Sequence, residues 1–214
     1  MSGRGRGRSY CTGGLKRGVD LALSLLALTL LSPVLLIIAV AVASSSGLPV
    51  LFRQVRIGLD GRPFRLVKFR TMRADAEGGL PITASGDPRV TSLGRLLRAS
   101  KLDELPQLLN VVRGEMSFVG PRPEVPRYVA LYTREQREVL QVRPGLTDPA
   151  TVLFRDEETL LGAVEETRRE AYYVNEVLPR KLALNLQYVE QARLMYDLEL
   201  IVGTIKAVLV PSRT

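Results

Sequence analysis

The sequence has no histidine and no tryptophan, and it has one cysteine among its 214 residues. Histidine is the commonest general base near neutral pH and the commonest metal ligand. Its absence excludes Ser-His-Asp triads and Cys-His pairs and argues against zinc sites. The single Cys11 cannot form an internal disulfide, which argues against an oxidised, secreted scaffold. If the protein is an enzyme, its chemistry rests on carboxylates, Lys, Arg, hydroxyls or a hard metal ion.

Acidic residues are scarce in the first part of the chain. Residues 1–127 hold 19 Lys or Arg against 9 Asp or Glu, whereas residues 128–214 hold 11 against 13, within a net charge of +8. Hydrophobic residues make up 46% of the chain, which is enough for a packed core. The basic part is expected to face an anionic partner: phospholipid headgroups, nucleic acid or a phosphorylated substrate.

The apolar run from Leu21 to Ala43 has 23 residues and no charge. That length would span a hydrocarbon core of about 30 Å as a helix. However, Pro33 follows Ser32 at its centre, and proline removes a helix hydrogen bond. Both flanks are basic, and basic flanks prefer the cytoplasmic side. We therefore predict a re-entrant helix-break-helix, with the Ser32 and Thr29 hydroxyls as candidate partners for the carbonyls that Pro33 frees.

Two other interpretations of this run stay open on the residues alone. A kinked helix can still span a membrane. A cleaved signal peptide would use Ala41-Val42-Ala43 as its cleavage site, although the run is longer than is usual for one.

The segments on either side of the apolar run differ in composition: the N-terminal one is of low complexity, and the one after the run has the pattern of a hairpin. Residues 1–14 are rich in Gly and Arg, and we expect them to be disordered. Residues 49–58 and 63–72 resemble strands, and Asp60-Gly61 between them predicts a hairpin turn. The second strand ends in a basic cluster, or alternatively forms a solvated edge that discourages aggregation. The basic residues are Lys68, Arg70 and Arg73.

Three helical segments follow. Residues 90–99 alternate apolar and basic residues at helical spacing, so their leucines would face a core or membrane while Arg95 and Arg98 face away. Residues 148–182 are acidic and strongly helical in pattern. An amphipathic C-terminal helix either docks on the domain or lies in the membrane interface. Its apolar positions are Leu194, Leu198, Ile201, Ile205 and Val208.

Residues 100–124 combine charge and stiffness around a short apolar helix. Pro106 is tolerated in a first helical turn, so this helix is expected to begin near it, with Asp103 and Glu104 at its N-terminus. That end carries partial positive charge and unpaired N–H groups, which favour ionised carboxylates and suit a phosphate. The structural alternative is a capping box formed by Ser100 and Asp103.

An arginine is held between two prolines just downstream. Arg122 lies in the rigid frame Gly-Pro-Arg-Pro-Glu, and arginine suits bidentate phosphate contacts. A surface ion pair with Glu124 or Glu115 is the structural alternative, but it does not explain the two prolines. Arg143-Pro144-Gly145 repeats the arrangement in weaker form. With Lys68 and a membrane-dipping segment, these groups favour phosphoryl transfer to or from a lipid-borne group, and Mg²⁺ is the ion that suits them.

Four stretches carry a resemblance to a known family. They are KRGVDLALSLLALTLLSPVLLIIA, FRQVRIGLDGRPFRLVKFRTM, DPRVTSLGRLLRASKLDELPQLLNVVRGEMSFVGPRPE and RPGLTD, over most of residues 15–148. The chain resembles the small monotopic phosphoglycosyl transferases, bacterial sugar transferases that start glycan assembly on undecaprenyl phosphate. The implied α+β, mostly helical architecture is a disordered basic tail (1–14), a re-entrant membrane helix (15–46) and a cytoplasmic catalytic domain (47–214) with a hairpin and interfacial amphipathic helices.

The resemblance also implies an activity. Members of that family transfer a phosphosugar from a UDP-sugar to polyprenyl phosphate and release UMP, using Mg²⁺ and a covalent phosphosugar–aspartate intermediate. This is the first membrane step of glycoconjugate assembly, for O-antigen, capsule, exopolysaccharide or glycoprotein. Asp103 matches the nucleophile and Glu104 its partner, and both are assigned to the metal. The implied location is the cytoplasmic face of the bacterial inner membrane, among phospholipids and without nucleic acid; a homo-oligomer stays open.

Further residues are assigned through the same resemblance. Ser32 and Pro33 match the break of the re-entrant helix. After RPGLT, many members have Gly-x-Ala-Gln and Asn-Gly-Arg-Asn runs, whereas this chain reads DPATVLFRDEETLL. Arg155 therefore matches a later family arginine only loosely, and the sugar is not implied. The residues expected to bind substrate are Lys68, Arg70, Arg122, Glu124, Arg143 and Arg155.

Two rival functions stay open. A membrane-tethered binding module would hold anionic lipid or nucleic acid without catalysis, but it would not need adjacent carboxylates, and aromatic residues for stacking bases are only 6% of the chain. A membrane phosphatase or pyrophosphatase would use the same aspartate and release phosphate instead of UMP.

Overall fold

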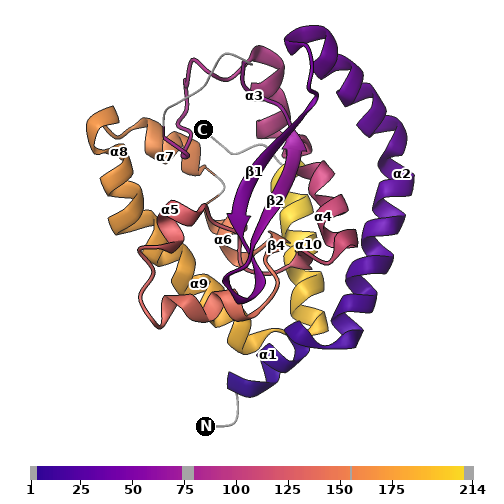
Figure 1. The fold of residues 1–214 in the computed structure, drawn as a ribbon, viewed down its shortest axis with the longest axis vertical. Helices are drawn as coiled ribbons and strands as arrows, with labels where there is room; N and C mark the ends of the chain where they lie inside the picture. Colours follow the sequence, from indigo (N-terminus) through magenta and orange to yellow (C-terminus); the bar gives the residue numbers. More distant parts are fainter. Residues whose placement is uncertain (1–3, 74–79, 155, 210–214) are drawn as a thin grey trace.

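The computed structural model describes residues 4–73, 80–154 and 156–209, which form a mostly helical fold with two small pairs of strands (Figure 1). The helices are α1 (Arg4–Thr12), α2 (Gly14–Ser46), α3 (Ser92–Ala99), α4 (Leu108–Arg113), α5 (Pro126–Val129), α6 (Pro149–Leu153), α7 (Glu157–Gly162), α8 (Glu166–Tyr172), α9 (Leu178–Gln191) and α10 (Leu194–Leu209). The strands are β1 (Leu51–Ile57), β2 (Pro63–Phe69), β3 (Ser117–Val119) and β4 (Gly145–Thr147). Short 3-10 helices lie at η1 (Leu59–Gly61), η2 (Leu102–Gln107) and η3 (Gln136–Gln141), and a one-turn π-helix lies at η4 (Tyr173–Val177).

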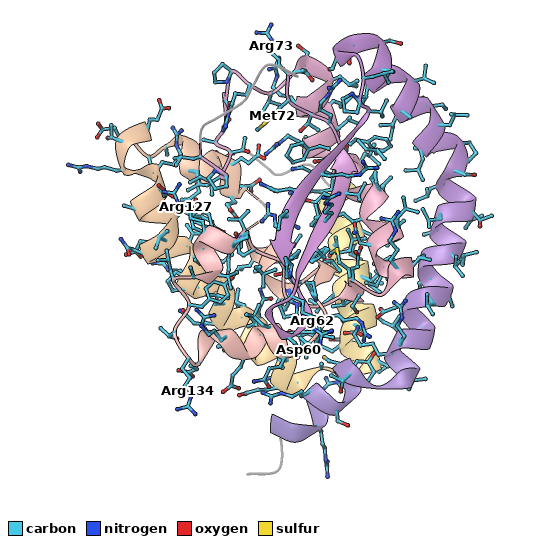
Figure 2. The ribbon with its side chains drawn as sticks, in the orientation of Figure 1. Asp60, Arg62, Met72, Arg73, Arg127 and Arg134 are labelled. Carbon is cyan, nitrogen blue, oxygen red and sulfur yellow. The ribbon has the colours of Figure 1, made fainter. Side chains whose placement is uncertain are left out.

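The predicted hairpin is confirmed. β1 and β2 pair antiparallel, from Leu51 opposite Phe69 to Ile57 opposite Pro63. The turn between them needs a left-handed backbone, and Asp60 (φ 55°) tolerates that conformation better than most residues. Figure 2 shows the labelled Asp60 at the turn end of the hairpin, near α1, with Met72 and Arg73 at the opposite end.

The predicted break in the membrane segment does not interrupt the helix. Residues Gly14–Ser46 form one continuous α-helix, with Pro33 inside it. Pro33 has no N–H to offer the Thr29 carbonyl four residues earlier. The Ser32 hydroxyl donates to that carbonyl instead, at 2.8 Å between the oxygens, as the sequence suggested. The Ser32 hydroxyl therefore gives the freed carbonyl a hydrogen-bond partner, and the helix continues past Pro33.

α2 arches along one side of the molecule (Figure 1), and it is long and apolar enough to cross a membrane. Only 11% of its most apolar 18-residue window is buried, so it is not the core helix of a soluble fold. Its two ends do pack: Lys16, Asp20 and Ser24 are buried near the start, and Ile38 and Val42 near the finish. The side chains between them are exposed and apolar. They include Leu25, Leu26, Leu30, Leu36 and Ile37.

The expectation of disorder over residues 1–14 is wrong for Arg4–Thr12, which form α1. α1 packs against α9, with Cys11 buried. One of the glycines that suggested disorder serves this contact, since a Cβ atom at Gly7 would lie 2.4 Å from the Glu190 carbonyl oxygen. A backbone approach that close admits only glycine.

The later helices differ in detail from their predicted pattern. The acidic stretch 148–182 is helical but divides into several short elements, from α6 to the start of α9. α10 docks on the domain, which was one of the two open alternatives. However, it docks through Asp197 and Leu200, while Leu198 and Ile205 stay exposed. The side chain of Val208 lies outside the described residues.

A short parallel pair of strands brings together two distant segments. β3 pairs with β4, with Ser117 opposite Gly145 and Val119 opposite Thr147. The chain just beyond β3 touches the Arg-Pro-Gly segment so closely that a Cβ atom at Gly120 would lie 2.5 Å from the Arg143 carbonyl oxygen. Glycine at this position therefore lets the segment carrying Arg122 lie against β4.

Candidate active site

The capping-box alternative for Ser100 is wrong. Its hydroxyl donates backward to the Leu96 and Leu97 carbonyls of α3, at 2.8 and 3.2 Å, and the described η2 turn has no side-chain cap. Lys101 takes a left-handed conformation (φ 55°), so the chain turns sharply between α3 and η2. This sharp turn separates α3 from η2, and the first turn of η2 is left without a side-chain cap.

Asp103 and Glu104 lie in that first turn, as predicted, although the turn begins at Leu102 rather than near Pro106. The 3-10 turn runs directly into α4 at Leu108. Asp103 is only 4% exposed, and its Oδ1 has no hydrogen-bond partner among the described residues. An unpaired buried carboxylate oxygen is costly and requires an explanation, and a bound ion or substrate would supply one.

Arg122 meets Glu104 across the site. Its Nη1 donates to Glu104 Oε2 at 3.2 Å, and its Nη2 donates to Oε1, so the pair is bidentate. The predicted alternatives do not occur, because Glu115 accepts from the Asn110 amide and Glu124 accepts from Tyr173 and lies 3.5 Å from Arg56. The two flanking prolines therefore hold Arg122 toward the buried carboxylates.

A cavity of about 150 Å³ lies over this pair. Lys68, Arg98 and Lys101 contribute basic side chains to its wall beside Asp103, and the Phe52 ring lies 5.5 Å from the Lys68 ammonium. The remaining wall is mostly polar, with Pro81, Ile82, Ala150 and Phe154 as its apolar members. It includes Arg56, Glu104, Arg122, Glu124, Tyr128, Thr151, Glu157, Glu158, Tyr173 and Lys181. Carboxylates and cations thus line one small hollow, as binding of a phosphorylated substrate requires.

The environment shifts the pKa values of the two neighbouring carboxylates, Asp103 and Glu104, in opposite directions. Burial, reinforced by the charge of Glu104, raises the pKa of Asp103 to about 6. Burial also disfavours the charged form of Glu104, but the charge and hydrogen bonds of Arg122 outweigh it and lower the pKa of Glu104 to about 2. Burial lowers the pKa of the Lys68 ammonium to about 8, against the attraction of Asp103. Asp103 is therefore a more basic carboxylate than usual, yet still largely ionised at neutral pH.

Some assigned residues lie elsewhere. Arg70 does not line the cavity; it donates to the Ser46 carbonyl at 2.5 Å and to the Gly47 carbonyl, and so holds the end of α2. Arg143 donates to the Gly114 carbonyl at 3.0 Å, at the end of α4. Arg155 lies outside the described residues. Lys68, Arg122 and Glu124 do reach the cavity with the two carboxylates.

Sequence patterning missed other residues of the wall. Arg98 was expected to face away, but it donates to Glu158 of α7 at 2.9 Å and borders the cavity. Lys181 of α9 reaches Glu157 at 2.7 Å. Helical periodicity shows which face of one helix is apolar, but it cannot show which acidic residue of a distant helix will meet a given cation.

The residues of the cavity fit a site in which a magnesium ion is bound jointly by the protein and a substrate phosphate, and they do not form an all-protein metal site. No group of three or more His, Cys, Asp or Glu residues in the described chain is arranged to hold a metal. Mg²⁺ is commonly bound by one or two carboxylates plus substrate phosphates, with water completing its shell. The unpaired Asp103 Oδ1 supplies one such donor, whereas both oxygens of the adjacent Glu104 already accept from Arg122.

Comparisons with known proteins identify the family of the chain. The family model described as bacterial sugar transferase matches residues 11–211. A UDP-glucose:undecaprenyl-phosphate glucose-1-phosphate transferase of Caulobacter vibrioides is 38% identical, over 91% of this chain and 69% of its own length. The transferase of the same name from Escherichia coli is 36% identical, over 89% and 39%. A UDP-N-acetylgalactosamine-undecaprenyl-phosphate N-acetylgalactosaminephosphotransferase of Aeromonas hydrophila is 34% identical, over 91% and 44%. The chain thus spans less than half of two of these three relatives.

Proposed function

Since this chain belongs to the bacterial sugar transferase family, we propose that it transfers a phosphosugar from a UDP-sugar to undecaprenyl phosphate and releases UMP. The observation that carries the proposal is Asp103: buried, unpaired at Oδ1, of raised pKa, and surrounded by cations. The names of the relatives supply the two substrates. Because those names differ in the sugar, no particular sugar is proposed.

The reaction proceeds in two displacements. An oxygen of Asp103 attacks the β-phosphorus of the UDP-sugar, the bond from that phosphorus to the bridging oxygen breaks, and UMP leaves. The phosphate oxygen of undecaprenyl phosphate then attacks the phosphosugar–aspartate, which restores the Asp103 carboxylate and gives a sugar diphospholipid. Covalent catalysis of this kind divides one difficult transfer into two easier ones.

The other cavity residues bind and orient. Arg122 and Lys68 offer donors and positive charge to the diphosphate, and Arg98 and Lys101 extend the same basic wall. Glu104 keeps Arg122 aimed at the site through two hydrogen bonds. Mg²⁺ held by Asp103 and Glu104 with the phosphates would neutralise charge on the diphosphate.

We further propose that α2 enters the membrane and returns, with both ends on the cytoplasmic face. Its two ends are attached to the same folded body: Arg17 donates to the Val111 and Val112 carbonyls, and Arg70 donates to the Ser46 carbonyl. A helix tied to one body at both ends cannot place its ends on opposite sides unless those contacts break. The exposed apolar middle is the part that would contact lipid.

The activity is tested with purified protein, Mg²⁺, undecaprenyl phosphate and a panel of UDP-sugars. At least one donor should yield UMP and a sugar diphospholipid, and EDTA should abolish both. Release of inorganic phosphate without UMP would indicate the hydrolase instead. Radiolabelled donor without acceptor should label the protein at Asp103, and normal turnover without such an adduct would exclude the covalent route.

The topology is tested by cysteine labelling in intact cells. In a Cys11→Ala background, cysteines placed at the exposed positions Thr12 and Arg53 should both be protected from a membrane-impermeant reagent in intact cells, and both should react once the cells are permeabilised. Labelling from opposite sides would establish a membrane-spanning helix and contradict the re-entrant proposal.

A further inference from the structure

We infer that the first turns of α2 position the active site, with Asp20 holding the segment that carries Arg122. This inference rests on the proposed function for the role of Arg122, but the contacts themselves do not. Two segments meet at the Glu104–Arg122 pair, η2 with α4 and the stretch after β3. Both segments are bonded to α2 within its first two turns.

Asp20 binds the free edge of β3. Its Oδ1 accepts from the Phe118 N–H at 3.0 Å, and its Oδ2 accepts from the Ser117 hydroxyl at 2.7 Å. Neighbouring N–H groups of a strand point to opposite sides. The other side of this stretch is bonded to β4, where the Ser117 N–H donates to Pro144 and the Gly120 N–H to Thr147. The strand is therefore clamped from both sides, with Arg122 two residues beyond Gly120.

Arg17 binds the other segment. Its Nη1 donates to the Val111 carbonyl at 2.6 Å and its Nη2 to the Val112 carbonyl at 3.0 Å, at the end of α4. The Val111 carbonyl also accepts from the Gly114 N–H, and the partial negative charge at this end of the helix makes a cation there favourable. The opposite end of the same short η2–α4 unit presents Glu104. Arg17 and Asp20, one helical turn apart, thus set the placement of the two partners.

Asp20 also has an ion pair outside β3, within a mostly buried group that we call the anchor cluster. The Lys16 ammonium lies 3.8 Å from Asp20 Oδ1 and donates to Asp197 Oδ2 at 2.6 Å. The members of the cluster are Tyr10, Lys16, Asp20, Ser117, Tyr188 and Asp197. Since the apolar run of α2 begins at Leu21, the membrane helix and the catalytic arginine share one rigid support.

The test compares Asp20→Ala, Asp20→Asn and Ser24→Ala. Asp20→Ala removes both acceptors and should lower kcat/KM for UMP release by about tenfold to a hundredfold, as small misplacements in active sites do. Asp20→Asn can accept from Phe118 and donate to Ser117, so it should restore most of the activity. Ser24 is equally buried one turn later with no hydrogen-bond partner for its hydroxyl, so its alanine variant should match the wild type.

Two measurements separate positioning from simple destabilisation. Hydrogen exchange at the amides of residues 117–122 should accelerate in Asp20→Ala, and less in the milder Ser117→Ala, but not in Ser24→Ala. In an Arg122→Lys background, where bidentate binding is already lost, Asp20→Ala should cost little further activity. Unchanged exchange, or equal losses in both backgrounds, would overturn the inference. The exchange result stands whether or not the wild type releases UMP, so failure of the proposed function would be recognised separately.

Discussion

The cavity at Asp103 and the anchor cluster at Asp197 bury carboxylates to the same degree, 4% and 5% exposed, and treat them oppositely. Asp197 accepts hydrogen bonds from Tyr10, Lys16 and Tyr188, at 2.6 to 2.8 Å. Asp103 has an oxygen without any partner in the described chain. A buried charge with all its hydrogen bonds made stabilises the fold, whereas one left incomplete is available to a ligand. Asp148 combines the two cases, because its buried Oδ1 accepts from the Thr151 N–H at the start of α6 while its Oδ2 has no partner in the described chain.

The largest expected effect is that of Asp103→Asn. Loss of the nucleophile should lower UMP release by at least about a thousandfold, because the covalent step has no substitute. The same change should stabilise the protein. The pKa of Asp103 is raised in the fold, so its ionisation penalises the folded state as pH rises from about 4 through 6, and fully so above that. At pH 7.5, removal of the charge should add about 2 kcal/mol to the free energy of unfolding.

Asp87→Asn is the matched control for the predicted direction of the change in the free energy of unfolding. Arg89 lowers the pKa of Asp87 through hydrogen bonds, so that carboxylate stabilises the fold above its unfolded pKa. Its neutral variant should be less stable than the wild type at pH 7.5. If both variants shift the melting temperature in the same direction, the contrast between strained and satisfied carboxylates fails.

A smaller effect on UMP release is expected from a change in the anchor cluster. Asp197→Asn leaves the buried Lys16 without its closest counter-charge and should destabilise the fold by about 3 kcal/mol. The fraction that remains folded should retain UMP release within severalfold, since Asp197 does not touch the cavity. Chemical denaturation in detergent micelles measures the first quantity, and Glu199→Gln on the exposed side of the same helix is the control. Loss of specific activity without loss of stability would make Asp197 a functional residue.

The smallest expected effect is the pH dependence of the wild type. kcat/KM should rise through pH about 6 as Asp103 ionises, and fall above pH about 8 as Lys68 loses its proton. Glu104 should leave no limb in this range, because Arg122 keeps it ionised to about pH 2. Initial rates of UMP release across pH 5 to 9 would show a bell. A flat profile would mean that neither group titrates during turnover.

The candidate site was predictable where the signal was local. Asp103 and Glu104 at a helix start, and Arg122 between prolines, were recognisable from spacing and stiffness, and all three meet in the cavity. Arg70 was wrongly assigned to the cavity, although it belongs to the same basic cluster as Lys68. Lys68 and Arg70 would share one face of a continuing strand, but β2 ends at Phe69, and Arg70 beyond it bonds to the end of α2 instead.

The sequence by itself determined the hairpin and the length and apolarity of α2, and it narrowed the partner of the carbonyl that Pro33 frees to two hydroxyls. Each of these depends on residues within a few positions of one another. Only the tertiary structure decided that Arg122 binds Glu104, that Arg17 and Asp20 support both partners, and that the glycine-rich start of the chain folds against α9. Those outcomes depend on which distant segments come into contact, and buried charges and close backbone contacts constrain that choice more strongly than local propensity does.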